Sequence, residues 1–251
     1  MIRGLYTAAS GMMVESTRQE TITNNLANSE TTGFKRDLAL QRSHGEQPVV
    51  RLGDNQPFGI RPVIGSLGTG SLIDGIHTSY EQGSLQETGR DLDLAMAGDG
   101  YFVVETEQGL RYTRNGAFSI DADRMLVNDQ GHRVMGTTGP LQLPAGEVQV
   151  DQAGSVFVND AMQGQLAQVS FADNTELQKV GDSLFTAAEG AQQQPVTGMV
   201  KQGFLEGSNV QAVQEMVQML AAMRAYETNQ RVVQAQDDML RKATNEIAAL
   251  R

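Results

Sequence analysis

The chain has 251 residues and a formal net charge of −11, and it contains neither cysteine nor tryptophan. Phosphate binding needs a basic protein face, so this charge argues against nucleic acid as a partner. The lack of cysteine excludes disulfides and thiolate metal sites. No run of about 18 apolar residues occurs, so we expect no membrane insertion. The opening residues lack the apolar core and cleavage site of a secretory signal, so we expect any export to proceed without a cleaved signal peptide.

The acidic side chains are concentrated in the middle of the chain. Residues 1–36 carry four basic and three acidic side chains, and residues 211–251 carry five of each. Residues 37–210 carry ten basic and twenty-two acidic side chains. Near-neutral ends can pack against copies of themselves, whereas an acidic middle suits a solvated surface.

The first part of the chain, residues 1–36, is predicted to be a helix followed by a turn. Uncharged positions recur every three or four residues, with Glu15 as the exception. These positions are Leu5, Ala8, Met12, Gln19, Ile22 and Leu26. Gly11 costs about 1 kcal/mol relative to alanine in a helix interior, so we expect a packing reason for it.

This helix is predicted to end near Asn28. Gly33 can adopt a left-handed conformation after it, and Phe34 then needs a hydrophobic contact. The motif of the turn consists of Asn24, Asn25, Asn28, Gly33 and Phe34. An ordinary surface helix of a globular domain would show the same pattern.

Residues 37–84 are predicted to form an extended, glycine-rich connector. The glycines between Gly59 and Gly70 do not make a phosphate-binding loop, because no lysine follows Gly70 and no strand-to-helix context is visible.

Residues 85–200 are predicted to form a β domain, either a sandwich or barrel-like. Short apolar runs alternate there with glycine and aspartate turns, and Asn115-Gly116 is a strong hairpin signal. The predicted strands are residues 91–97, 101–104, 111–114, 117–120, 133–136, 141–143, 148–150, 156–158 and 167–171.

After a return connector at residues 201–208, residues 209–251 are predicted to form a second long helix with Ser208 as its N-cap. An uninterrupted three-four spacing is typical of a heptad-like seam. The seam positions are Met219, Ala222, Tyr226, Asn229, Val233, Gln236, Leu240, Ala243, Ile247 and Leu250. The two polar positions, Asn229 and Gln236, predict a fixed register or partner. The seam can pair with another chain or, as a hairpin, with the N-terminal helix.

Nothing in the sequence assembles the converging groups that an enzyme needs. The three histidines lie in unrelated stretches, and the aspartates near Asp91 and Asp121 lack the order of an EF-hand loop. We therefore predict no enzyme activity, cofactor, metal or small-molecule substrate. A ligand- or protein-binding β module on a helical stalk, and a hydrolase with an unrecognised acid pair, are the alternatives.

Three blocks of the chain resemble the flagellar rod and hook family, the axial proteins of the bacterial flagellum. They occur in the family's order and span nearly the whole chain. The blocks are the opening helix through Lys35, the pair Gly98–Val104 and Tyr112–Phe118, and Gln202–Val210 with the helix that follows. In one departure, Asp123-Arg124-Met125 stands where the family usually has a turn glycine.

The resemblance implies an α+β fold in which the terminal helices pair as a coiled-coil-like stalk and line a tube, with a central all-β domain of short antiparallel strands outside it. It implies a structural subunit of the flagellar basal-body rod, a motility structure whose helical tube transmits torque to the hook. The partners would be copies of the chain, other rod and hook axial proteins and the type III export apparatus. The implied assembly residues are Leu5, Met12, Ile22, Leu26, Met219, Tyr226, Val233, Leu240 and Ile247.

Overall fold

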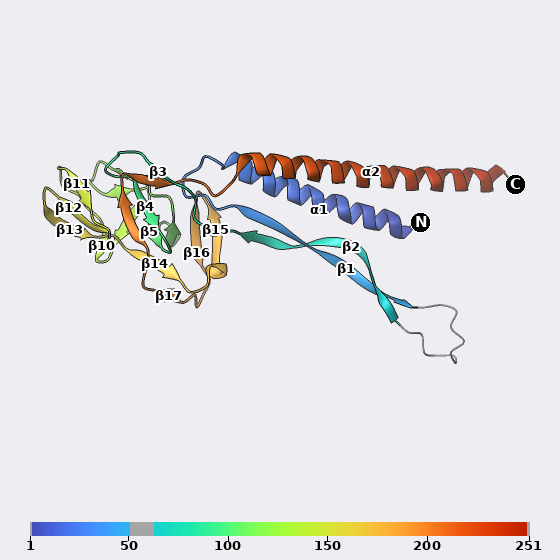
Figure 1. The fold of residues 1–251 in the computed structure, drawn as a ribbon, viewed down its shortest axis with the longest axis horizontal. Coiled ribbons are helices and arrows are strands. Elements are labelled where there is room, and N and C mark those ends of the chain that lie inside the picture. Colours follow the sequence, from blue (N-terminus) through green and yellow to red (C-terminus); the bar gives the residue numbers. More distant parts are fainter. Residues whose placement is uncertain (1, 51–62, 250–251) are drawn as a thin grey trace. The chain divides into compact units, whose positions relative to one another are not determined.

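The computed structural model describes residues 2–50 and 63–249 and divides the chain into two compact units. The first unit holds residues 1–26, 37–77 and 212–251, and the second holds residues 27–36 and 78–211. An N-terminal helix, a central antiparallel β region and a C-terminal helix follow one another along the chain (Figure 1). The fold class is therefore α+β, as predicted. Neither helix is long and apolar enough to cross a membrane, within the part of the chain described.

The two helices of the first unit are α1 (Ile2–Ala27) and α2 (Ala212–Ala249). α1 ends next to Asn28, as predicted. The N-cap predicted for α2 was wrong: the Ser208 hydroxyl accepts a hydrogen bond from the Val210 N–H at 3.2 Å, four residues before the helix begins. Val210, which falls within the predicted helix of residues 209–251, is buried ahead of α2.

The helices α1 and α2 run antiparallel and lie in contact. Each step of seven residues forward along α1 is matched by a step of seven residues back along α2. The three contacts that define this register are Asn25 with Glu215, Gly11 with Asn229 and Gly4 with Gln236. Two of the three contain a glycine of α1, which supplies the packing reason expected for Gly11.

A long hairpin completes the first unit. Strand β1 (Asp37–Val50) pairs with β2 (Val63–Thr78). The segment is extended, as expected, but its pairing into a hairpin was not predicted. The Thr7 hydroxyl donates to the Thr69 carbonyl at 2.8 Å, and the Ser10 hydroxyl accepts from the Ser71 N–H at 3.2 Å. Small polar side chains of α1 therefore hold the backbone of β2.

The second unit is built around strand β5 (Tyr101–Thr106), which pairs with β6, β9 and β14. Two short ladders pair the beginning of this unit with its end. β4 (Leu94–Ala97) pairs with β18 (Met199–Gln202), and β3 (Leu85–Glu87) pairs with β19 (Phe204–Glu206). The other strands of this unit are β3 (Leu85–Glu87), β4 (Leu94–Ala97), β6 (Gly109–Thr113), β7 (Ser119–Ile120), β8 (Leu126–Val127), β9 (Arg133–Gly136), β10 (Gly139–Pro140), β11 (Val148–Val150), β12 (Ser155–Val158), β13 (Ala161–Gln165), β14 (Gln168–Phe171), β15 (Leu177–Gly181), β16 (Leu184–Ala187), β17 (Gln193–Gln194), β18 (Met199–Gln202) and β19 (Phe204–Glu206).

Two buried side-chain clusters form the core of this unit. One includes Phe102 and Phe118, whose rings meet edge to face with centroids 5.4 Å apart. The other includes Tyr101, Phe171 and Phe185. Alternate residues of β5 enter different clusters, so the strand is buried on both faces.

The hairpin predicted at Asn115-Gly116 was wrong. β6 pairs with β5 and β16, while β7 pairs with β8. Gly116 instead lies against the Leu94 carbonyl, at a place where any side chain would collide with backbone. The glycine therefore permits a close approach rather than a reversal. Residues 141–143 are also not a strand, although both of their leucines are buried.

Three loops of the β region share one hydrogen-bond pattern. In each, the side-chain oxygen of an Asp or Asn accepts from the N–H groups two and four residues later. In each loop, the residue three positions after the Asp or Asn has a positive φ. This residue is Arg124 (63°), Gly131 (82°) or Gly154 (80°). The loop that lacks the family's glycine therefore keeps the same turn, with an arginine in the left-handed region.

We predict that Arg124→Gly stabilises the β region relative to Arg124→Ala by about 1 kcal/mol, because a left-handed conformation costs a side chain about that much. Both variants lose the bond from Arg124 Nε to the Leu143 carbonyl, so their difference isolates the backbone. Urea unfolding followed by circular dichroism measures it. Gly131→Ala, whose Cβ would meet open space, is expected to lose a similar amount. Equal stability of Arg124→Gly and Arg124→Ala would contradict the strain.

Candidate functional site

The contact face of α1 includes small and polar residues. A side chain at Gly11 would approach the Asn229 amide to 2.8 Å, and one at Gly4 would approach Gln236 to 3.2 Å. Asn25 is fully buried at the other end of the same face. Ile22, a member of the predicted stripe, is itself buried. Gly4, Gly11 and Asn25 each lie one position before a predicted residue, and an apolar pattern does not mark them because glycine and asparagine carry no hydrophobic signal.

The predicted assembly residues differ in their exposure within the chain. Ile22 is buried, whereas Tyr226 remains 37% exposed. Intermediate exposure is found for Leu5, Met12, Leu26, Met219, Val233 and Leu240. The side chain of Ile247 and all of Leu250 lie outside the residues that the structure describes.

A second face of α2 is apolar and exposed, and the sequence analysis missed it. Charged side chains are absent from the exposed positions of residues 212–223, since the one charged residue there, Glu215, is buried. The face consists of Val213 (77% exposed), Met216 (49%), Val217 (62%), Leu220 (56%) and Met223 (48%). On α1, Tyr6 and Met13 are exposed to a similar degree, one heptad apart. Exposed apolar surface of this kind marks a site of protein association.

The Asn25 side chain closes the end of α1. Its oxygen accepts from the Asp37 N–H at 2.9 Å and its nitrogen donates to the Asp37 carbonyl at 2.8 Å. The Asn25 amide thus makes the two backbone hydrogen bonds that a neighbouring strand would make with Asp37, the first residue of β1. Asn24 is exposed, and the Asn28 carbonyl accepts from the Thr31 N–H at 3.3 Å.

The turn after α1, residues 31–36, is called the junction below and belongs to the second unit. Gly33 has a φ of 67°, and a Cβ there would meet the backbone of Asn115. The Phe34 ring is buried beneath the Lys179 ammonium, 3.6 Å from the ring centroid. Both expectations are met: a left-handed glycine and an enclosed phenylalanine. A cation over the ring face adds an electrostatic attraction to the burial.

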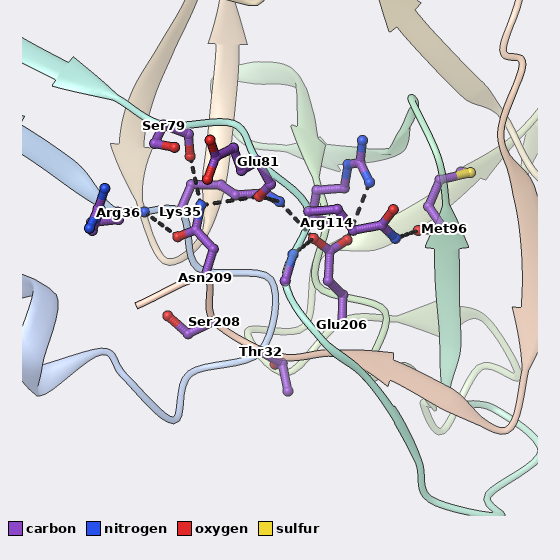
Figure 2. Close-up of polar contacts among 12 residues, drawn as sticks. Thr32, Lys35, Arg36, Ser79, Glu81, Met96, Arg114, Glu206, Ser208 and Asn209 are labelled. Atoms are coloured by element: carbon purple, nitrogen blue, oxygen red, sulfur yellow. Dashed lines mark hydrogen bonds and ion pairs between the residues drawn. The ribbon is translucent and has the colours of Figure 1, made fainter. Parts of the chain in front are cut away.

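A buried ion cluster lies beside the junction (Figure 2). One Glu206 oxygen accepts from Lys35 Nζ at 2.6 Å, and the other accepts from Arg114 at 3.2 Å. The side chains of Lys35, Arg114 and Glu206 are only 1%, 4% and 0% exposed. Glu206 also accepts from the Gly83 N–H at 3.0 Å. One carboxylate therefore serves two buried cations, and removing it would leave both uncompensated.

Asn209 joins the junction to the segment between β2 and β3. Its side-chain oxygen accepts from the Arg36 N–H at 2.7 Å, and its amide nitrogen donates to the Ser79 and Glu81 carbonyls (Figure 2). The Lys35 ammonium also donates to the Glu81 carbonyl, at 2.8 Å.

The three blocks that resemble the rod and hook family meet at this place. Lys35 closes the first block, Arg114 lies in the second and Glu206 lies in the third. The sequence motifs therefore mark the parts of one packing site, although their spacing gives no hint of the ion cluster.

Burial shifts the pKa of Lys35 in the cluster and of Tyr101 beside it. Desolvation lowers the pKa of Lys35 from its usual value, and the Glu206 carboxylate opposes that shift. Burial also raises the pKa of Tyr101, whose ring lies 4.9 Å from the Arg114 guanidinium. One carboxylate is shared by two cations, and the contact holds three separate segments of the chain together.

No group of three His, Asp or Glu side chains positioned to hold a metal occurs among the residues that the structure describes. A cavity of about 320 Å³ lies in the first unit beside the Asn25–Glu215 contact. Its walls include Val14, Arg18, Ile22, Leu38 and Ile73.

We predict that Gly33→Ala destabilises the β region by at least about 3 kcal/mol, since backbone strain and a backbone collision add. Gly89→Ala is the matched control, because Gly89 has a φ of 69° with open space around it. The control is expected to lose only about 1 kcal/mol in urea unfolding. A loss of equal size in both variants would mean that Asn115 yields to the added methyl group.

We also predict a pH dependence from Lys35. Its pKa in the folded chain lies below 10.5, so folding expels a proton there and the charged amine costs stability at neutral pH. That cost is relieved as pH rises through the lowered pKa toward 10.5. The unfolding free energy of the wild type should therefore rise relative to Lys35→Met over this window. A difference that stays flat between pH 7 and 10.5 would contradict the lowered pKa.

Comparison with known proteins places these features in a family. Residues 5–35 match the family model described as "Flagella basal body rod protein", residues 95–158 the "Flagellar hook protein FlgE/F/G D1 domain", and residues 201–246 the "Flagellar basal body rod FlgEFG protein C-terminal". The matched segments contain Lys35, Arg114 and Glu206.

Relatives match over nearly their whole length. The flagellar basal-body rod protein FlgG of Agrobacterium fabrum is 37% identical, with 95% of this chain and 97% of the relative covered. FlgG of Borreliella burgdorferi is 35% identical, with 98% of each covered. The rod protein FlgF of Caulobacter vibrioides is 30% identical over the full length of both. The chain belongs to the family of flagellar basal-body rod proteins, structural components of the bacterial flagellum.

Proposed function

We propose that this chain is a rod subunit that assembles with copies of itself, and with other rod and hook proteins, into a helical tube that transmits torque to the hook. The observation that carries the proposal is the exposed, uncharged apolar face of α2 at residues 212–223. An isolated chain would leave that face in water at a free-energy cost.

The assembly is proposed to be heterologous. The apolar faces of α1 and α2 differ in residue content, and each would meet a different surface on a neighbour. Contacts of that kind propagate into an open filament when the rotation between copies does not close a ring. Of the predicted assembly residues, Leu5, Met12, Leu26, Met219, Tyr226, Val233 and Leu240 are partly exposed and would contribute to these contacts. Ile22 and Ile247 remain proposed assembly residues as well.

Within each subunit, α1 and α2 are proposed to pair as an antiparallel coiled coil. The heptad interval between Gly4 and Gly11, matched by that between Asn229 and Gln236, supports this pairing. The polar layers would fix its register at some cost in stability. The helices would line the tube, and the β region would lie outside it.

The remaining expectations are proposed together. Residues 1–36 and 209–251 form the inner domain, residues 37–84 and 201–208 connect, and residues 85–200 form the outer domain. The chain reaches the basal body through the flagellar export apparatus. Relatives named FlgG are 30–37% identical and the Caulobacter vibrioides FlgF is 30% identical; the higher identities, to FlgG of Agrobacterium fabrum and Borreliella burgdorferi, favour the FlgG type.

We predict that Leu220→Asp abolishes tube formation by the concentrated protein, because a charge would be buried in the contact between copies. Electron microscopy scores the tubes. The variant's melting temperature should stay close to the wild-type value, since Leu220 is 56% exposed in the single chain.

Gln214→Asp is the matched control, because Gln214 is exposed on the same helix and points away from the apolar face by helix spacing. It is expected to form tubes normally. If Leu220→Asp formed tubes as readily as this control, the apolar face would not be the contact.

A further inference from the structure

The junction makes its key hydrogen bonds with a segment from far along the chain, residues 204–209, called the closing segment here. The Gly33 N–H donates to the Glu206 carbonyl at 2.8 Å, and the Arg36 N–H donates to the Asn209 side chain at 2.7 Å. The Phe34 carbonyl accepts from the Asn209 N–H at 3.4 Å. Two backbone donors and one acceptor of the junction thus depend on residues that follow the whole β domain.

The closing segment also supplies the only carboxylate of the ion cluster. Without Glu206, the Lys35 ammonium and the Arg114 guanidinium would be two buried like charges, each almost without solvent. An uncompensated buried charge is strongly unfavourable, so the junction cannot close around them. Local bonds alone, such as that from Phe34 to the Thr31 carbonyl, do not remove this obstacle.

The closing segment has its own anchor on the β domain. β19 pairs with β3 over three residues, and the Gly207 N–H donates to the Ser84 carbonyl at 2.8 Å. It is therefore positioned by the folded domain, and the junction closes against it afterwards.

We propose that the closing segment acts as a completion switch: the junction takes its folded form only when the chain is complete through Asn209. Glu206 follows Lys35 by 171 residues. Synthesis proceeds from the N-terminus at about 5–20 residues per second, so the junction of a growing chain stays open for roughly 10–30 s after Lys35 is made. Incomplete chains keep the turn after α1 open until the β domain exists. The switch operates in a single chain and does not require assembly.

Trypsin tests the switch, because it cleaves after Lys35 and Arg36, and Lys35 is buried when the junction is closed. The full chain carrying Glu206→Gln should be cut after Lys35 at least tenfold faster than the wild type, as measured by mass spectrometry of the peptides over time. Cleavage after Arg133, within the ladder of β9 with β5, should change less than twofold.

Asn209→Ala tests the same switch without altering charge, and it should also expose Lys35. Glu147→Gln, at an exposed carboxylate of the same domain, is the control and should leave both cleavage rates unchanged. If neither Glu206→Gln nor Asn209→Ala accelerates cleavage after Lys35, the junction closes without the closing segment and the proposal is wrong. If cleavage after Lys35 and Arg133 rises together, Glu206 only stabilises the whole domain, and the proposal is equally overturned.

Discussion

The carboxylate of Glu206 is the constraint on which the second unit depends. It lies fully buried between Lys35 and Arg114, which approach from the N-terminal junction and from the end of β6. Such clusters contribute less to stability than an apolar core of the same volume, because each ion is desolvated. The cluster places one buried carboxylate between two buried cations, so the three segments that carry them meet at one place in the second unit.

The helix pair of the first unit is also held in register by polar contacts, although these are weaker than the ion pairs of the second unit. Glycines face amide side chains at intervals of seven residues, and the buried Asn25 contacts Glu215 at the end of the series. A shift of one turn would place an amide against a larger side chain. Close approach at glycine and polar matching at asparagine define the register jointly, while the apolar side chains of α2 remain exposed. A single chain therefore has ordered helices and an unsatisfied outer face.

The sequence predicted the order of the elements because their signals are local. The helices follow from spacing, β5 and β9 from apolar runs, and Gly33 from its conformational freedom. What failed was non-local: Gly116 looks like a turn and is a packing glycine. The ion cluster joins residues 171 positions apart, and no periodic signal encodes such a distance. Resemblance to a family located these residues without giving their chemistry.

The departure at Arg124 shows how far a motif can change without losing its shape. Two sister loops place glycine at the left-handed position, whereas this loop places arginine there and retains the aspartate hydrogen bonds. The Arg124 side chain also donates to the Leu143 carbonyl at 2.9 Å, which offsets part of the backbone strain. The turn is therefore specified by the acceptor at its start, Asp121, and glycine only lowers its energy. The missing glycine alone would suggest a different turn here, but the hydrogen bonds to Asp121 show that the turn is the same as in the two other loops.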